Sequence, residues 1–179
     1  IKSSAASDVY KRQTLFQDFY KYEATFRENI AYGNLNAIDD DEKLKRICRK
    51  FDLEQLIDET DEQLDCQIGY WFDNGKQISI GQWQKIGLAR AFCKNADLYI
   101  MDEPNAAMDA ISEQRLAMLY QELLDGKKGI IVAHKFNNLI RSVDRIIVLE
   151  HGEITGNGSH EELTKSNETY KKLYEIQVQ

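Results

Sequence analysis

The chain has 179 residues, of which 42% are hydrophobic and 30% are charged, and its formal net charge is −7. This length suits one domain with a buried core, and the plentiful aromatic and branched aliphatic residues exclude a disordered chain. No apolar run approaches the ~18–20 residues that a membrane span needs. The acidic balance argues against nucleic acid as a partner, because proteins that bind it usually carry a basic surface.

Residues 1–13 are small, polar and aperiodic, and they fit no pattern that follows them. We expect them to be a disordered or non-native leader, and we exclude them from the fold. The domain is expected to span residues 14–179, with a helical part over about 25–95 and a sheet-bearing part over about 96–179.

The stretch before residue 95 is mainly helical by pattern. Two capping boxes of the form S/T-x-x-E/Q open helices, because the first and fourth residues can bond each other's main chain. Leu44, Ile47, Cys48 and Phe51 recur at helical spacing in another segment. The predicted elements are a strand at 14–19, a short helix from Thr25, helices at 39–51 (capped by Asp39) and 53–59, and a helix from Ser79 to about Lys94.

After residue 95, continuous apolar strands alternate with helices. This alternation indicates an α/β fold in which helices cover both faces of a parallel sheet. The predicted strands are 98–101, 129–133, 145–150 and 154–155, and the predicted helices are about 109–125, 137–141 and 168–177, with a capping box at Ser159.

Two adjacent carboxylates, Asp102 and Glu103, follow the apolar strand 98–101. Ligands of open parallel sheets bind at the carboxyl ends of the strands, and successive side chains there point to opposite sides. One acid can therefore hold Mg²⁺ while the next reaches a water molecule. The alternative is a strand-end turn whose acids are simply solvated.

Four other short elements accompany this pair. Ser79 and the small residues after it open a helix whose N-terminus suits a phosphate group, although an ordinary capped helix would have the same sequence. Gln17 lies near the start of the domain, and Asp109 follows soon after Pro104. His134 ends a buried strand, and a single histidine in such a place is more often structural than catalytic.

In order and spacing, these five elements resemble the nucleotide-binding domain of ATP-binding-cassette (ABC) proteins, from about Leu15 to Gln177. That family has a glutamine loop, a signature sequence L-S-G-G-Q, a Walker B strand ending in D-E, a D-loop and a switch histidine. The glutamine loop is matched by Gln17, the signature by Ser79, Gly81 and Gln82, Walker B by Asp102 and Glu103, the D-loop by Asp109, and the switch by His134.

The resemblance implies a P-loop NTPase-like sheet flanked by helices, with a helical signature subdomain. It also implies ATP and Mg²⁺ as ligands and a second nucleotide-binding domain, identical or different, as a partner. Asp102 and Gln17 would hold Mg²⁺, Glu103 would act as general base, and His134 would contact the γ-phosphate. The signature residues would stabilise the ATP that the partner domain holds.

The flanking sequence is similar to that of exporter-type domains. The segment Gln82-Trp83-Gln84-Lys85 is similar to bacterial peptide, bacteriocin and lantibiotic exporters. This similarity implies a motor domain at the cytoplasmic face of a bacterial plasma membrane, joined to the transmembrane domain of the same transporter. It would drive export of a peptide or lipid-like substrate.

Two features depart from the family pattern. No G-x-x-x-x-G-K-[S/T] loop (Walker A) is found, so we expect a C-terminal fragment that lacks the first part of the domain and hydrolyses no ATP alone. Exposed strand edges would make such a fragment unstable. Ile80 stands at the first signature glycine, which indicates either a weakened site or a tolerated variant. The alternatives are a soluble ABC-type ATPase and a non-catalytic fragment that acts as a binding module.

Overall fold

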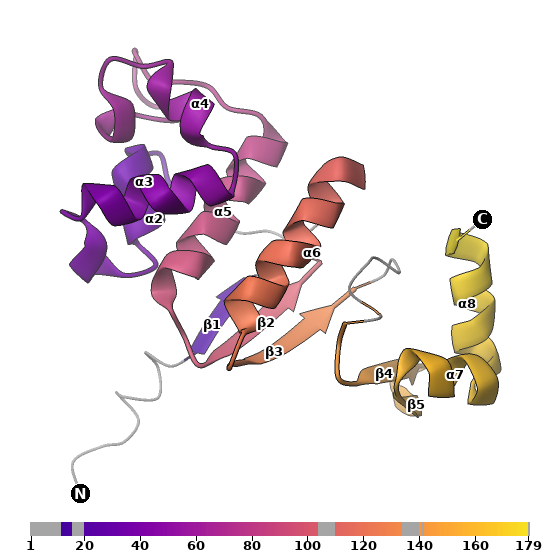
Figure 1. The fold of residues 1–179 in the computed structure, drawn as a ribbon. Coiled ribbons are helices and arrows are strands. Elements are labelled where there is room, and N and C mark those ends of the chain that lie inside the picture. Colours follow the sequence, from indigo (N-terminus) through magenta and orange to yellow (C-terminus); the bar gives the residue numbers. More distant parts are fainter. Residues whose placement is uncertain (1–11, 16–19, 104–109, 134–139, 141, 179) are drawn as a thin grey trace, which may run out of the picture. The chain divides into compact units, whose positions relative to one another are not determined.

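The structure is a computed structural model that describes residues 12–15, 20–103, 110–133, 140 and 142–178. The chain divides into two compact units, made of residues 1–108 with 123–132 and of residues 109–122 with 133–179. We call them unit 1 and unit 2, and Figure 1 shows their helices and strands.

Unit 1 contains a three-stranded parallel sheet in the order β1-β2-β3. The strands are β1 (Arg12–Leu15), β2 (Leu98–Asp102) and β3 (Lys128–Val132). The parallel sheet is as predicted, but β1 begins inside the segment that we assigned to the leader. The remainder of the predicted first strand, residues 16–19, lies outside the described residues.

The two faces of this sheet differ. Side chains alternate between the faces of a strand, and Tyr99 and Met101 of β2 are buried on one of them. On β3, Ile130 and Val132 are 55% and 46% exposed, although the register places Ile130 beside Ile100 of the central strand. We expected helices over both faces, and these two apolar side chains of β3 remain open to solvent.

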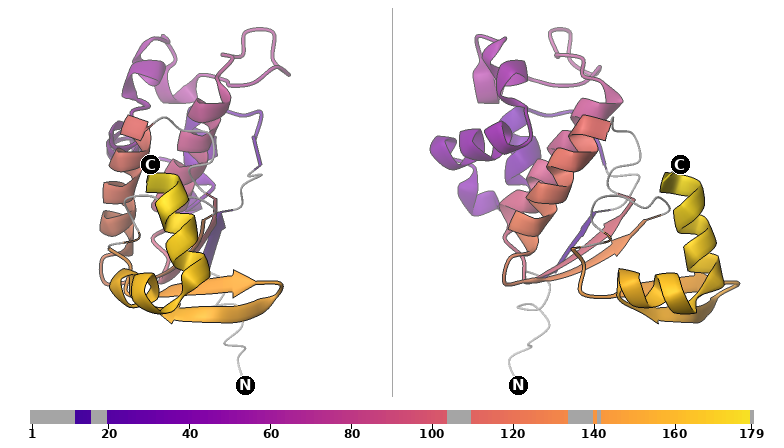
Figure 2. Two further views of the ribbon diagram at one scale, coloured as in Figure 1. Left: turned by 90° about the vertical axis from the view of Figure 1, so that its right-hand side faces the viewer. Right: turned by 45° about the vertical axis from the view of Figure 1, so that its right-hand side comes forward.

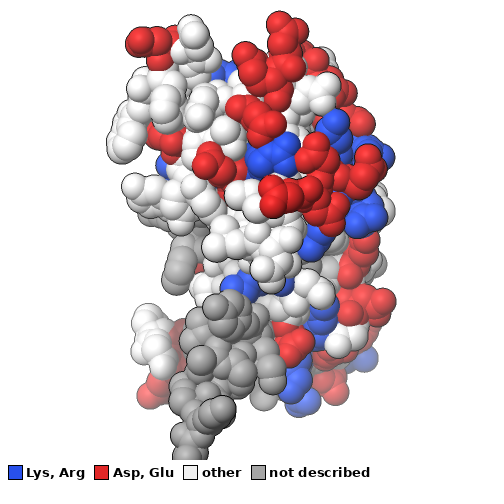
Figure 3. Space-filling model, turned by 90° about the vertical axis from the view of Figure 1, so that its left-hand side faces the viewer, with Lys and Arg blue, Asp and Glu red and all other residues white. Residues whose placement is uncertain are grey.

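The helices of unit 1 form its apolar core. They are α2 (Phe26–Ala31), α3 (Asp41–Lys50), α4 (Glu54–Asp58) and α5 (Ile80–Lys94), with 3-10 turns η1 (Leu35–Ala37) and η2 (Gln63–Asp65). Phe26, Leu44 and Ile86 are fully buried among them. On the face drawn in Figure 3, acidic side chains gather with basic ones between them, consistent with the net charge.

The predicted helix starts are largely confirmed. In the first capping box the Glu28 N–H donates to Thr25 Oγ1 over 3.1 Å, and the Thr25 N–H donates to Glu28 Oε2 over 2.9 Å. The capping box that begins at Ser159 also forms. The cap of α3 is Asp40 rather than Asp39, because the Asp40 carboxylate is the one that accepts from the Lys43 N–H.

Arg27 ties three parts of unit 1 together. Its guanidinium donates to Asp65 Oδ1 of η2 over 2.6 Å, to the Ile38 carbonyl over 2.9 Å and to Asp41 of α3. The hydrogen bond from Arg27 lowers the pKa of Asp65 below its ordinary value. This network therefore joins α2 to elements that lie beyond it in the sequence.

Unit 2 is built on an antiparallel hairpin of β4 (Ile146–Glu150) and β5 (Glu153–Gly158). A tight turn joins the two strands: His151 and Gly152 have φ angles of 50° and 84°, which suits a two-residue hairpin turn. Unit 2 also includes α7 (His160–Ser166), α8 (Glu168–Val178) and most of α6 (Ala110–Leu124).

A small apolar cluster holds the hairpin to the helices that follow it. Val148 of β4, Leu163 of α7 and Tyr170 of α8 are buried together, with Ile146 packed against them. Figure 2 shows α7 against the hairpin. The predicted helix at 137–141 lies almost entirely outside the described residues. Across the ranges that the structure describes, no helix is both long and apolar enough to cross a membrane.

Replacing Ile86 by alanine is expected to lower the free energy of unfolding by about 2–5 kcal/mol, because the change leaves a cavity in the core. Urea unfolding followed by the fluorescence of the buried Trp83 measures this change. Ile80→Ala is the matched control on the same helix, since Ile80 is 67% exposed. Its expected effect is within about 0.5 kcal/mol, and equal losses in the two variants would contradict the buried position of Ile86.

Replacing Asp65 by asparagine is expected to lower stability at pH 7 by about 1 kcal/mol or less, as for other exposed ion pairs. Because the pKa of Asp65 is lowered in the folded state, its contribution is present above the ordinary pKa of aspartate, about 3.9, and is lost as the pH falls further.

Urea unfolding of both proteins between neutral and acidic pH tests this. The difference in the free energy of unfolding between the wild type and Asp65→Asn should be largest at pH 7. It should shrink as the solution is acidified to below about pH 4. Asp61→Asn, in the chain segment just before η2, removes the same charge as a control. A difference in the free energy of unfolding that grows on acidification would contradict the lowered pKa of Asp65.

Candidate functional site

The carboxyl end of β2 presents the two adjacent acids. Asp102 is the last residue of the strand and is paired in register with Val132 of β3. Glu103 has a φ of 43°, in the left-handed region, and its N–H donates to the Val132 carbonyl over 3.0 Å. A left-handed residue other than glycine costs about 1–3 kcal/mol and persists only where its surroundings hold it.

The main chain has different conformations at the two acids. Asp102 still belongs to the pleated strand, whereas Glu103 begins the turn away from it, and both residues are half-buried. The neighbouring strand fixes the turn through the Val132 carbonyl. The two acids at the carboxyl end of β2 thus differ in main-chain conformation, one extended and one left-handed.

The second part of the site is the first turn of α5. Ser79 caps the helix: the Gln82 N–H donates to Ser79 Oγ over 3.2 Å, and the Ser79 N–H donates to Gln82 Oε1 over 2.7 Å. The predicted capping box is therefore confirmed. This turn contains no acid, whereas the first turns of α2, α3, α4, α7 and α8 do. The positive end of the α5 dipole is therefore not offset by an acid of its own turn.

Gly81 is a glycine that its own surroundings do not require. A Cβ atom there would meet only Ser79 Oγ, at 4.0 Å, and its φ angle is not in the left-handed region. Glycine inside a helix costs about 0.5–1 kcal/mol relative to alanine. The packing of unit 1 therefore does not account for a glycine at this position.

Figure 1 shows α5 running in the opposite sense to β2. The first turn of the helix therefore lies on the side toward which β2 points. Gln17, Asp109 and His134, which the sequence also predicts as site residues, lie outside the described residues.

The donor set that the structure describes fits a magnesium ion. The Asp102 carboxylate would supply a hard oxygen ligand at the carboxyl end of the central strand β2. No group of three or more His, Cys, Asp or Glu residues within the described ranges could hold a metal ion by itself. Mg²⁺ is commonly bound through one or two carboxylates together with phosphate oxygens and water, so it does not need such a group.

Sequence reasoning did not single out Arg90 of α5. This residue lies four positions after the buried Ile86, on the side of α5 that faces the core. Its guanidinium donates to the Asn29 carbonyl over 2.7 Å and to the Tyr20 carbonyl over 3.1 Å. The signal that could have revealed it is a charged residue at helical spacing within an apolar face.

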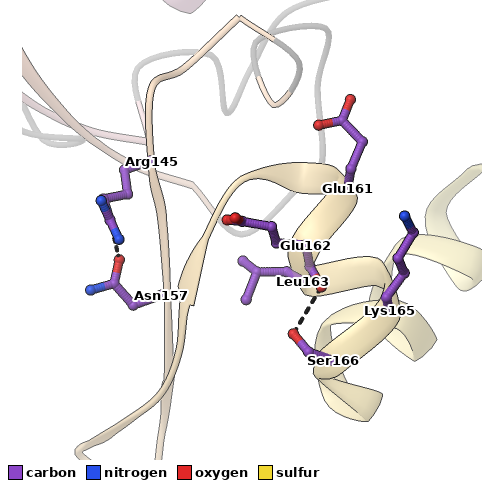
Figure 4. A pocket seen from close by; sticks show the side chains of 7 residues that line it. All are labelled: Arg145, Asn157, Glu161, Glu162, Leu163, Lys165 and Ser166. Atoms are coloured by element: carbon purple, nitrogen blue, oxygen red, sulfur yellow. Dashed lines mark hydrogen bonds between the residues drawn. The ribbon is translucent and has the colours of Figure 1, made fainter.

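A hollow of about 510 Å³ in unit 2 lies apart from these residues in the sequence. Figure 4 shows that Arg145 at its wall points to Asn157, to which its Nε donates over 2.7 Å. Glu161, Glu162 and Lys165 give the wall both signs of charge. None of the predicted site residues lines it, and we assign it no role.

The sequence matches the family described as ABC transporter over residues 4–106, more than half of the chain. The chain therefore belongs to the ABC transporter family, as its motifs predicted. It resembles a solved bacterial Atm1-family ABC exporter with ATP bound, with a TM-score of 0.83 at 24% identity over 97% of this chain and 29% of that one. This likeness confirms the α/β fold with its parallel sheet and flanking helices.

Curated relatives include two transport ATP-binding proteins of bacteria. Identity is 43% with the subtilin transport ATP-binding protein SpaT of Bacillus subtilis, over 94% of this chain and 28% of that protein. It is 40% with the nisin transport ATP-binding protein NisT of Lactococcus lactis subsp. lactis, over 89% and 26%. An ATP-dependent lipid A-core flippase of Ralstonia nicotianae is 35% identical over 93% and 28%. The chain thus spans little more than a quarter of these relatives' length.

Replacing Gly81 by alanine is expected to leave the free energy of unfolding unchanged or to raise it by up to about 1 kcal/mol, because the added Cβ meets open space and alanine favours the helix. If another molecule approaches this turn closely, the same change should lower nucleotide-dependent activity of the transporter that contains the chain. Urea unfolding and ATP turnover measure the two effects. Unchanged turnover in Gly81→Ala would show that no close approach requires the glycine.

Proposed function

We propose that this chain is part of the ATP-binding and ATP-hydrolysing motor of a bacterial membrane ABC exporter. The observation that carries the proposal is the pair of acids at the end of β2, with Glu103 held in a left-handed conformation by β3. The family membership and the relatives that transport subtilin and nisin support it.

In this proposal the two acids divide the chemistry between them. Asp102 would hold Mg²⁺, with Gln17 completing the ligand set. The ion, when bound, would offset the charge of the phosphate groups. Glu103 would accept a proton from the attacking water as general base. His134 would contact the γ-phosphate, and Asp109 would belong to the D-loop.

The first turn of α5 would act on a nucleotide held by a second nucleotide-binding domain. Ser79 Oγ already accepts from the Gln82 N–H, so its hydroxyl proton can be donated to a phosphate oxygen. Gly81 leaves room for that phosphate, and the helix dipole favours its charge. Ile80, which is exposed beside them, would narrow this approach.

The transmembrane domain of the same transporter would be the other partner. Support comes from an exposed group of aromatic side chains in unit 1. The Tyr20 and Tyr22 rings lie 4.8 Å apart, and the Tyr22 and Tyr32 rings lie 4.9 Å apart. Exposed aromatic residues are enriched at protein interfaces. The chain would then work at the cytoplasmic face of the membrane, and the substrate would be a peptide or lipid-like molecule.

Replacing Glu103 by glutamine in the purified transporter that contains this chain is expected to lower ATP turnover by about 10²–10⁴-fold, because the amide cannot take the proton. Phosphate release measures turnover, and binding of a fluorescent ATP analogue should persist in the variant. The exposed Glu153→Gln is the control and should keep the wild-type rate. Turnover that survives Glu103→Gln would overturn the assignment of the base, and a wild-type transporter without turnover would overturn the proposed function.

A further inference from the structure

The side chain of Arg90 lies among oxygen atoms of a segment far from it in the sequence. Its Nε donates to the Asn29 carbonyl over 2.7 Å, its Nη2 to Asn29 Oδ1 over 2.9 Å, and its Nη1 to the Tyr20 carbonyl over 3.1 Å. Three nitrogens of one planar group thus bind three oxygens in fixed positions. Lysine has no such fork and could not reproduce the arrangement.

Asn29 extends this contact. It is fully buried, and its Nδ2 donates to the Tyr22 carbonyl over 2.9 Å and to the Thr25 carbonyl over 3.0 Å. The carbonyls of Tyr20 and Tyr22 are therefore held by Arg90 and Asn29, which also bond each other. The main chain of 20–22 is fixed to α5 through this pair.

The burial of the charged Arg90 side chain costs free energy of folding. Burial lowers the pKa of the guanidinium, and the Asn29 and Tyr20 oxygens that accept from it are neutral. The Tyr22 ring, whose centroid lies 4.5 Å from the guanidinium carbon, supplies part of the compensation. An apolar side chain would often fill such a place at no loss of stability. The fork geometry is therefore the property that distinguishes Arg90 from an apolar residue at this position.

The main chain at Arg90 is equally constrained. A Cβ atom on Gly33 would lie 1.9 Å from the Arg90 carbonyl oxygen, so the chain just after α2 touches α5 at this point. Only glycine permits that approach. Side-chain and main-chain contacts thus join the same two parts of unit 1 at one position of α5.

We propose that Arg90 is a positioning residue, which fastens the segment Tyr20–Tyr22 to α5 so that this segment and the helix turn at Ser79 move as one body. The inference rests on the proposed function, because the turn at Ser79 is the one that would face the nucleotide. From Arg90 to Ser79 the helix spans about 16 Å, at ~1.5 Å per residue. A displacement of the exposed tyrosines would thereby reach the phosphate-facing turn.

The test compares Arg90→Met and Arg90→Lys with Arg46→Met, which removes an exposed arginine of α3, in the transporter that contains this chain. We expect both Arg90 variants to lower kcat by about 10-fold, because a misplaced site loses rate. The KM for ATP should stay within about twofold, since binding is retained. Arg46→Met should match the wild type in both constants.

Hydrogen exchange supplies a readout that does not depend on turnover. In Arg90→Met the amides of Gln82 and Trp83, near the far end of α5, should exchange faster, together with those of residues 20–29. A purely local structural role would raise exchange near residue 90 and leave the first turn unchanged. Tyr22→Leu removes only the ring beneath the guanidinium, so it decides the matter if Arg90→Met does not fold.

The outcomes separate the two claims. Unchanged kcat per folded molecule in the Arg90 and Tyr22 variants, with exchange at Gln82 and Trp83 unchanged, would overturn the positioning role and leave the proposed function standing. A loss of turnover that only follows the folded fraction would also overturn it. If the wild-type transporter hydrolyses no ATP but the Gln82 amide still exchanges faster in Arg90→Met, the proposed function fails. The coupling of Tyr20–Tyr22 to the turn at Ser79 through Arg90 is then retained.

Discussion

The candidate site depends on the parallel pairing of β2 with β3. The register that sets Asp102 beside Val132 also places the Val132 carbonyl where the Glu103 N–H can reach it. That single main-chain hydrogen bond holds Glu103 in a left-handed conformation, at the point where the chain leaves the sheet after Asp102. Without the neighbouring strand, Glu103 would lose the hydrogen bond that holds its main chain.

Helix α5 connects the other parts of unit 1. Its first turn holds Ser79 and Gly81 in a capped conformation without an acid. Its middle fills the core through Ile86, and its later turns meet α2 through Arg90 and Gly33. A helix that is anchored at its core and at one end is a stiff support for residues at the other end.

Local patterns predicted much of this fold because their causes are local. The capping boxes at Thr25, Ser79 and Ser159 involve residues three positions apart, and all three form. The left-handed Glu103 depends on a carbonyl 29 residues away, and the contacts of Arg90 cross 61 and 70 positions. Local sequence patterns do not predict contacts between residues so far apart in the chain. The roles of all the predicted site residues, and the division of the domain, stay predictions.

The small cluster of Val148, Leu163 and Tyr170 has a consequence for how unit 2 opens. Each buried side chain of this kind contributes about 1.5–3 kcal/mol, and among the residues whose burial the structure describes, unit 1 holds many more of them around α5. Free energies of local opening follow such differences. The hairpin and its helices would therefore fray before the core of unit 1, and proteases acting on the native protein would make their first cuts there.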